Sequence, residues 1–143
     1  MKKFFLLLVI MLAGASFSHA QLASGKYMIG GSLGFNSGGP SWNLSPSAGY
    51  MLTDDIGVGA SINANDPGNG LIMGVGVAAR KYWNIMDKTY LYGHAGLNLG
   101  VVGGGGVGLS VYPGVMYFIN DRLAIDGALN GLAGGGIGMS LLF

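Results

Sequence analysis

The stretch Gly136-Ile137-Gly138-Met139-Ser140-Leu141-Leu142-Phe143 decides the fold of this chain. Successive side chains of an extended strand point to opposite faces. One face would be apolar and consists of Ile137, Met139, Leu141 and Phe143. The other is small apart from Leu142. A soluble domain rarely leaves such a strand as an open edge, whereas a closed barrel pairs its last strand with its first. The stretch therefore predicts a barrel, and the rest of the chain is expected to repeat its pattern.

The composition favours a β protein that spans a membrane. Of 143 residues, 50% are hydrophobic, 9% are charged and 29 are glycine, and the mean hydropathy is +0.50. Such a hydropathy is typical of membrane proteins, but bundles of spanning helices carry far fewer glycines. Every acidic residue is Asp, so Glu, which usually decorates exposed helices, is absent. The absence of cysteine fits an exported protein that does not depend on disulfides.

Residues 1–20 have the three parts of a secretory signal peptide. Lys2 and Lys3 form the basic start, residues 4–12 the apolar run, and residues 18–20 the cleavage site. The apolar run is shorter than the roughly 20 residues that a helical span needs, which favours cleavage over a retained anchor. Residues 21–143 are then expected to form one barrel domain. Its five basic and six acidic residues give no reason to expect a nucleic-acid partner.

Eight runs of alternating apolar and small residues fill the rest of the chain, and each ends in turn residues. A repeat of roughly 15 residues suits strands of about 9 to 11 residues that cross a bilayer with tight turns. Pro46 should mark a bulge, because proline has no N–H for the ladder. The sequence predicts an all-β fold, an eight-stranded antiparallel up-and-down transmembrane β-barrel. Its strands are expected at residues 27–35, 42–52, 56–63, 71–83, 91–99, 107–119, 123–130 and 136–143, with one turn at 84–88.

Two other architectures explain the sequence less well. Residues 89–120 contain no Asp, Glu, Lys or Arg, as in a spanning helix. Their apolar residues recur at period two, however, and residues 103–106 and Pro113 would break a helix. A soluble β-sandwich also alternates, but its outer face would be charged, whereas the non-apolar face here is chiefly Gly, Ser, Ala and Asn.

Aromatic residues gather at the strand ends nearest the two chain termini, which we call the lower ends. A membrane–water interface selects such a ring, because Tyr and Trp place an apolar body in lipid and a polar tip among the headgroups. The predicted aromatic girdle consists of Tyr27, Tyr50, Tyr82, Trp83, Tyr90 and Tyr117.

Arg80, His94 and Asp126 are predicted to point into the barrel. A buried charge needs a partner, and Arg80 and Asp126 each lie a few residues above the lower turns. The two are therefore expected to pair across the lumen, with His94 beside them, as a polar cluster. No cofactor is expected, and the sequence offers no cluster of metal ligands.

Several short motifs follow one another along residues 21–143. They are LSPSAGY at 44–50 with IGVGA at 56–60, ARKYW at 79–83, YFIND at 117–121 before LAI at 123–125, and the terminal Phe143. In this order they resemble the outer-membrane β-barrel family of small eight-stranded, OmpA- and OmpX-like barrels, in the short form common in Bacteroidetes-type bacteria. The resemblance implies a place in outer-membrane lipid. It also implies that the barrel assembly machinery reads Phe143 as an assembly signal.

Two classes of function follow. The first, which we favour, is a monomeric barrel with a structural or interaction role and a blocked lumen, without catalysis. The second is a narrow, porin-like channel for water or small ions, because inward glycines leave room. A lipid-modifying barrel enzyme is a more remote alternative, since it would need His, Ser and an acid near one interface. His94 would be its histidine, and its candidate serines are Ser45, Ser47, Ser61, Ser110 and Ser140.

Overall fold

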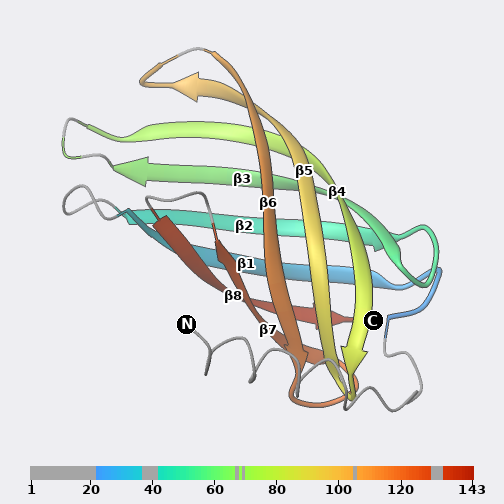
Figure 1. Cartoon of the computed structure of the whole chain (residues 1–143). Helices are drawn as coiled ribbons and strands as arrows, with labels where there is room; N and C mark the ends of the chain where they lie inside the picture. Colours follow the sequence, from blue (N-terminus) through green and yellow to red (C-terminus); the bar gives the residue numbers. More distant parts are fainter. Residues whose placement is uncertain (1–21, 37–41, 67, 69, 105, 130–133) are drawn as a thin grey trace.

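The computed structural model describes residues 22–36, 42–66, 68, 70–104, 106–129 and 134–143. The signal peptide predicted at residues 1–20 lies outside this part of the chain. No helix among the described residues is long and apolar enough to cross a membrane. The described residues form one closed, all-antiparallel barrel of eight strands in sequence order (Figure 1). The strands are β1 (Tyr27–Asn36), β2 (Trp42–Met51), β3 (Ile56–Asp66), β4 (Ile72–Met86), β5 (Thr89–Val102), β6 (Val107–Phe118), β7 (Leu123–Leu129) and β8 (Gly134–Leu142).

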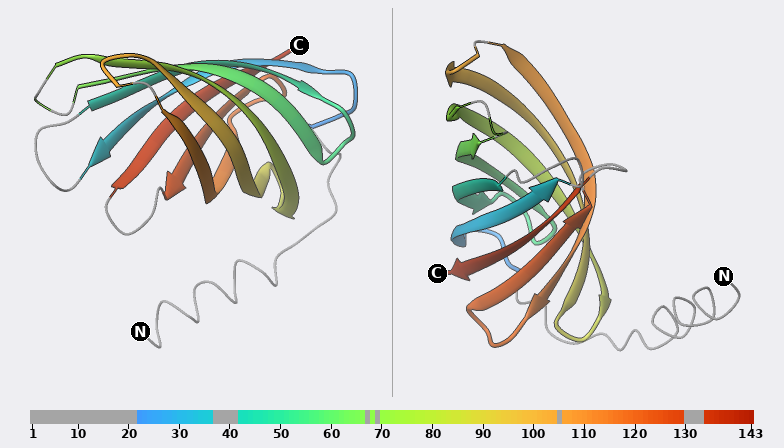
Figure 2. Two further views of the ribbon diagram at one scale, coloured as in Figure 1. Left: turned by 90° about the horizontal axis from the view of Figure 1, so that it is seen from above. Right: turned by 90° about the vertical axis from the view of Figure 1, so that its left-hand side faces the viewer.

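The terminal strand closes the barrel, as the sequence predicts. β8 pairs with β7 on one side and with β1 on the other, from Met28 opposite Leu142 to Asn36 opposite Gly134. Following the paired residues once round the wall from Tyr82 leads back to β4 at Ile72, ten residues nearer its start. This stagger tilts the strands against the barrel axis, as Figure 2 shows.

The alternation in the sequence sorts the side chains between the two faces of the wall. Large apolar residues point outward along every strand, and small or polar residues point inward. The buried apolar side chains are an exception, because they gather inside the barrel at its lower end. They are Leu22, Met51, Tyr82, Tyr90, Tyr92, Met116, Phe118, Ala124 and Leu142, which we call the lower plug. Leu142, the large residue on the small face of the last strand, belongs to this plug.

The two strands on either side of the β4–β5 turn run further into it than the sequence predicts. β4 continues to Met86 and β5 begins at Thr89, so the expected turn at residues 84–88 shrinks to Asp87 and Lys88. Such a two-residue turn requires a positive φ, and Lys88 supplies it with a φ of 61°. The sequence carries no glycine here to mark the turn, which explains why the prediction placed it too broadly.

The bulge predicted at Pro46 is wrong. Pro46 pairs with Gly31 in an unbroken β1–β2 register, and the β2–β3 register is the same on both sides of it. The ladder only skips the paired positions between Leu44 and Ser47 on the β3 side. The missing N–H is therefore accommodated by an omitted pair, without an inserted residue.

Candidate functional site

A chain of polar side chains lies inside the barrel just above the lower plug. The structure brings Arg80, His94 and Asp126 together from β4, β5 and β7. Arg80 donates from Nη1 to Asp126 Oδ2 at 3.4 Å and from Nε to His94 Nδ1 at 3.3 Å. Its guanidinium also lies over the ring of Tyr92, 4.9 Å from the centroid. The cation thus has three partners on two other strands, β5 and β7.

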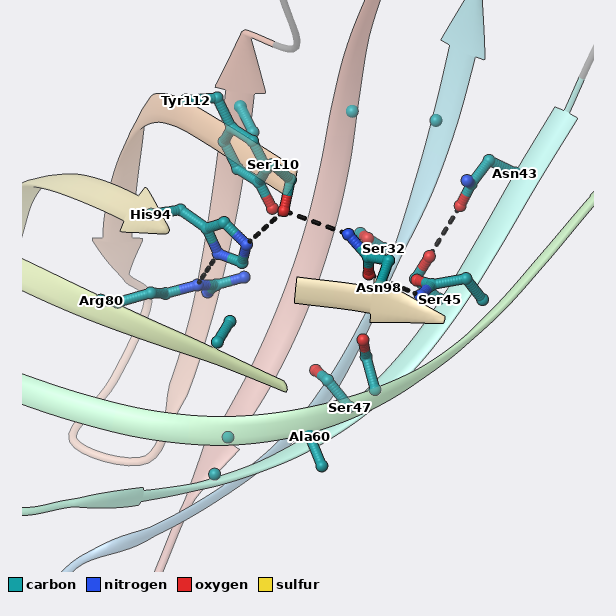
Figure 3. Close-up of a pocket in the computed structure, with 18 of the residues that line it drawn as sticks. Ser32, Asn43, Ser45, Ser47, Ala60, Arg80, His94, Asn98, Ser110 and Tyr112 are labelled. Carbon is teal, nitrogen blue, oxygen red and sulfur yellow. Dashed lines mark hydrogen bonds between the residues drawn. The ribbon is translucent and has the colours of Figure 1, made fainter. Parts of the chain in front are cut away.

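The row of polar side chains continues upward from His94 through uncharged groups (Figure 3). His94 Nε2 lies 3.4 Å from Ser110 Oγ, and Asn98 Nδ2 donates to the same oxygen at 3.2 Å. Asn63 Nδ2 then donates to Asn98 Oδ1 at 3.1 Å. The ring of Tyr112 stacks on His94, with centroids 4.2 Å apart. The network therefore joins five strands and fixes the orientation of each side chain.

The partners of His94 determine its tautomer. Arg80 can only donate, so His94 Nδ1 accepts and the ring proton lies on Nε2. The imidazole therefore donates to Ser110, whose oxygen also accepts from Asn98. Both acceptor positions of that hydroxyl are in use, which leaves its own hydrogen free to donate elsewhere.

Inward glycines make room for these side chains. A Cβ at Gly138 would overlap the Asp126 carboxylate, and one at Gly114 would lie 2.7 Å from Cε1 of the Tyr92 ring. A Cβ at Gly96 would lie 2.9 Å from His94 Nε2 and from Ser110 Oγ. The porin-like alternative expects water in the space above such inward glycines. In the structure, neighbouring side chains occupy it at these three positions.

A cavity of about 500 Å³ lies in the lumen above the charged pair. Most of its polar lining is uncharged, and Arg80 and Asp126, the only fully charged residues among the described ones that line it, pair with each other. The other inward-facing polar side chains of the lining are Ser32, Asn43, Ser45, Ser47, Ser61, Asn63, Asn65, Tyr82, Tyr92, His94, Asn98, Ser110 and Tyr112. Among the described residues, no group of three or more His, Cys, Asp or Glu side chains could hold a metal ion.

The lower plug closes the other end of this lumen. The side chains of Met51, Met116 and Phe118 are completely buried, and the Tyr82 and Tyr92 rings are tilted against each other 5.9 Å apart. Tyr90 packs edge-on against Phe118 at 5.7 Å. These residues lie next to the lower turns, so the polar cavity ends on a packed apolar layer.

The predicted aromatic girdle is partly wrong. Tyr82 and Tyr90 are 2% and 3% exposed and belong to the lower plug. Both occupy even-numbered positions, which face the lumen in β4 and β5, and no irregularity reverses this order between them and Arg80 or His94. The other four residues face outward near the lower turns, and their place at a membrane interface stays a prediction. They are Tyr27, Tyr50, Trp83 and Tyr117.

Outside the lumen, Lys81 forms an ion pair with Asp55 at the lower end of the wall. The ammonium group of Lys81 lowers the pKa of the Asp55 carboxyl below its ordinary value, and a hydrogen bond from the Thr53 hydroxyl adds to this effect. The side chains of Lys81 and Asp55 are 41% and 47% exposed, so this ion pair is expected to contribute little to stability.

Phe143 ends the seam between β8 and β1. Its N–H donates to Tyr27 O at 3.0 Å, and Tyr27 N–H donates to Phe143 O at 3.2 Å. The phenyl ring is 61% exposed on the outer face of the barrel. It therefore contributes little to the packed interior, and its role as an assembly signal stays a prediction.

Sequence reasoning did not select Tyr92, Tyr112, Asn98 or Asn63 as site residues. Their inward positions followed from the alternation, but a lumen position alone does not say which neighbour a side chain meets. The signal lay in the cross-strand register, because Tyr92 lies opposite Gly114 and His94 lies opposite Tyr112. That register depends on the lengths of the turns, which the sequence did not give.

Comparison with known proteins rests on structure alone, since no family model and no curated protein matches this sequence. A de novo designed transmembrane β-barrel superimposes with a TM-score of 0.70 and 16% identity, over 84% of this chain and 97% of that one. The N-terminal β-barrel domain of Pseudomonas aeruginosa OprF gives 0.61 and 16%, over 84% and 98%. The Yersinia pestis outer membrane protein Ail, solved in a phospholipid bilayer nanodisc, gives 0.55 and 17%, over 84% and 100%.

These structural similarities show a shared fold and nothing more. One of the neighbours is a designed protein, and all share fewer than a fifth of their residues with this chain. A Bacteroidetes-type origin stays a prediction. The chain has the fold of the small eight-stranded transmembrane β-barrels found in outer membranes, the fold that its resemblance to OmpA- and OmpX-like proteins implies.

Proposed function

We propose that this protein is an integral outer-membrane β-barrel with a structural or interaction role, rather than a pore or an enzyme. The observation that carries the proposal is the lower plug, whose side chains close the lumen below Arg80 and Asp126. The upper cavity is then closed at its lower end, where the Arg80–Asp126 pair lies on top of the lower plug. A barrel of eight strands has an interior just wide enough for side chains to fill, which agrees with such a plug.

The outer surface supports placement in a membrane. Apolar side chains such as Ile29, Val77, Leu97 and Met139 are about half exposed along the outward faces of four different strands. A soluble monomer rarely exposes a continuous apolar area of this extent. Outer-membrane lipid would cover it, and the aromatic side chains at the lower ends would then meet the headgroups. The barrel assembly machinery would insert the chain, with Phe143 as part of the signal.

The tautomer of His94 argues against serine-type hydrolysis. A serine nucleophile needs a neighbouring imidazole nitrogen that accepts its proton. Here Nε2 carries a proton and donates to Ser110, because Arg80 donates to Nδ1. Asp126, the acid of this cluster, pairs with Arg80. The histidine, serine and acid that a lipid-modifying enzyme would need are therefore present. Their hydrogen bonds, however, do not connect them in the order that such catalysis requires.

Conductance in planar lipid bilayers tests the proposal against the porin-like alternative. The refolded protein is expected to show no steady single-channel current. A double variant, Tyr92→Ala with Phe118→Ala, removes two aromatic rings of the lower plug and serves as a positive control. Its lumen should be open and should conduct ions. Steady current through the unaltered protein, at a level comparable with this variant, would establish the channel function instead.

A further inference from the structure

A row of polar side chains crosses the inner face of the wall at one level of the strand register. Ser47 on β2 lies opposite Ser61 on β3, and Ser61 lies opposite Gly76 on β4. Gly76 in turn lies opposite Asn98 on β5. The side chains of Ser47, Ser61 and Asn98 line the lumen cavity. Because neighbouring strands lie about 5 Å apart, the row spaces polar groups regularly across four of the eight strands.

Gly76 lets two members of this row approach each other. A Cβ at Gly76 would overlap Asn98 Oδ1 and would lie 3.0 Å from Ser61 Oγ. The amide of Asn98 therefore lies over the glycine, beside the hydroxyl of Ser61, although no hydrogen bond joins these two side chains. A group bound at this point of the cavity would contact both of them.

The hydroxyl groups of Ser32, Ser47 and Ser61 have no hydrogen-bond partner among the described residues. Figure 3 shows Ser32, Ser47 and Asn98 around the same space. Ser45, by contrast, donates to Asn43 Oδ1 at 2.7 Å. A serine hydroxyl can donate one hydrogen bond and accept two, and polar groups inside a protein are normally satisfied. The three free hydroxyls therefore need partners from outside the protein.

The polar network on the far side of the cavity has donors to spare. Asn98 Nδ2 donates one of its two hydrogens to Ser110, and Asn63 Nδ2 donates one of its two to Asn98. The second hydrogen of each amide and the hydroxyl hydrogen of Ser110 remain. Asn63 Oδ1 accepts no hydrogen bond from the part of the chain that the structure describes. Donors and acceptors thus lie side by side around the cavity.

The charges at the floor of the cavity are matched. Arg80 and Asp126 form an ion pair at 3.4 Å, and both ring nitrogens of His94 are already engaged. An anion would have to draw Arg80 away from Asp126, and a cation would have to draw Asp126 away from Arg80. Either exchange leaves one protein charge without its partner, which is costly. The cavity therefore favours an uncharged ligand.

We propose that the lumen cavity binds a small, uncharged, polyhydroxylated molecule of the sugar or polyol class, whose hydroxyl groups bond to Ser47, Ser61 and Asn98. Each hydroxyl of such a ligand both donates and accepts, as this wall requires. The cavity volume of about 500 Å³ lies within the range of small-molecule sites. This inference rests on the proposed interaction role of the barrel and gives that role a ligand class. Because the lower plug closes the barrel below, the ligand would reach the cavity from the upper end.

Water alone is the competing occupant. Waters would satisfy the same hydroxyls, and a ligand gains affinity only when it reproduces the hydrogen bonds of the waters that it displaces. A rigid ring with several hydroxyls does so at several positions of the row at once, and it loses little internal freedom on binding. The regular spacing of the row therefore favours the ring over separate waters.

NMR of the side-chain amides in dodecylphosphocholine micelles tests the proposal, with glucose as the probe. The proton–nitrogen signals of Asn63 and Asn98 report on the cavity directly. Both are expected to shift saturably as glucose is added. Glucose 6-phosphate and glucosamine have the same ring with a charge, so they should bind at least about tenfold more weakly.

Ser61→Ala should weaken glucose binding by about fivefold, the effect of one lost hydrogen bond. Ser47→Ala should weaken it to a similar extent. Ser140→Ala is the matched control, because Ser140 is a buried serine of the lumen that does not line the cavity. This substitution should leave the affinity for glucose unchanged. The backbone amide spectrum of each variant checks that the barrel is folded.

Shifts of Asn63 and Asn98 that never saturate would show that water alone fills the cavity, and they would overturn the proposal. Equal binding of the charged analogues, or unaltered binding by Ser61→Ala, would overturn it as well. Conductance tests the closed lumen separately. A closed barrel that binds no glucose contradicts this inference alone, whereas steady current through the unaltered protein contradicts the proposed function.

Discussion

Removing Arg80 should destabilise the barrel more than removing any other single lumen side chain. Arg80→Ala eliminates the ion pair with Asp126, the hydrogen bond to His94 and the contact with the Tyr92 ring. Breaking a buried ion pair by losing one partner typically costs about 3–5 kcal/mol. The Asp126 side chain is 9% exposed and that of Arg80 is 24% exposed toward the cavity. We therefore expect a loss of about 3 kcal/mol, near the lower limit of that range.

Urea unfolding in detergent micelles measures this effect through a double-mutant cycle. Asp126→Ala should also destabilise, but less than Arg80→Ala, because the guanidinium keeps His94 and Tyr92 as partners. The double variant should be more stable than the sum of the two losses by about 2 kcal/mol, since it leaves no orphaned charge. Lys81→Ala, which breaks the exposed pair with Asp55, is the matched control and should change little. Strictly additive losses for Arg80 and Asp126 would refute the coupling read from their contact.

Three further predictions concern other parts of the molecule. Gly138→Ala should cost about 1–3 kcal/mol in urea unfolding, because its Cβ would displace the Asp126 carboxylate, whereas Gly127→Ala on the same wall meets open space and should cost little. Deleting Phe143 should lower outer-membrane insertion in cells while the purified chain still refolds in detergent; normal insertion in cells would argue against an assembly signal. Because Lys81 depresses the pKa of Asp55, the pair should stabilise the fold above the ordinary value of 3.8 and lose this contribution as the pH falls through the lowered pKa. The difference in urea midpoint between the parent chain and Lys81→Ala should therefore be constant near neutral pH and shrink only in acid, and a difference that shrinks at neutral pH would contradict this.

The strands were the most predictable part of the structure, because the alternation of residues states directly which face each one occupies. The errors in the predicted girdle arose because the height of a residue along the barrel axis was considered without the face to which its side chain points. Tyr82 and Tyr90 lie at the height of the girdle, but their even-numbered positions turn them inward. The alternation noted in the sequence already implied this for Tyr82, since it shares a face with Arg80.

Details of the site depended on the register between strands, which the sequence constrains weakly. The height shared by Arg80 and Asp126 could be estimated by counting from the lower turns. The stacking of Tyr112 on His94 could not, because it depends on the β5–β6 register, which places these two residues opposite each other. From the sequence, Pro113 indicates only a helix breaker, whereas in the structure it lies next to the last described β6–β7 pair, Gly114 opposite Ala128. The sequence alone does not show which neighbouring strand the nitrogen of a proline faces. One hydrogen bond of the strand must be known first, because the hydrogen-bonding direction alternates along it.

Closure by β1 and β8 also determines when this protein can finish folding. Met28 and Leu142 become neighbours although most of the chain separates them, so the last contact to form closes the longest loop. Contacts of such large sequence separation slow folding, and the hairpins between consecutive strands are expected to form first. Until the closing pair forms, both outer edges offer free backbone groups to any neighbouring strand. The partly folded chain therefore passes through a period in which its two ends are open to pairing with strands of other chains.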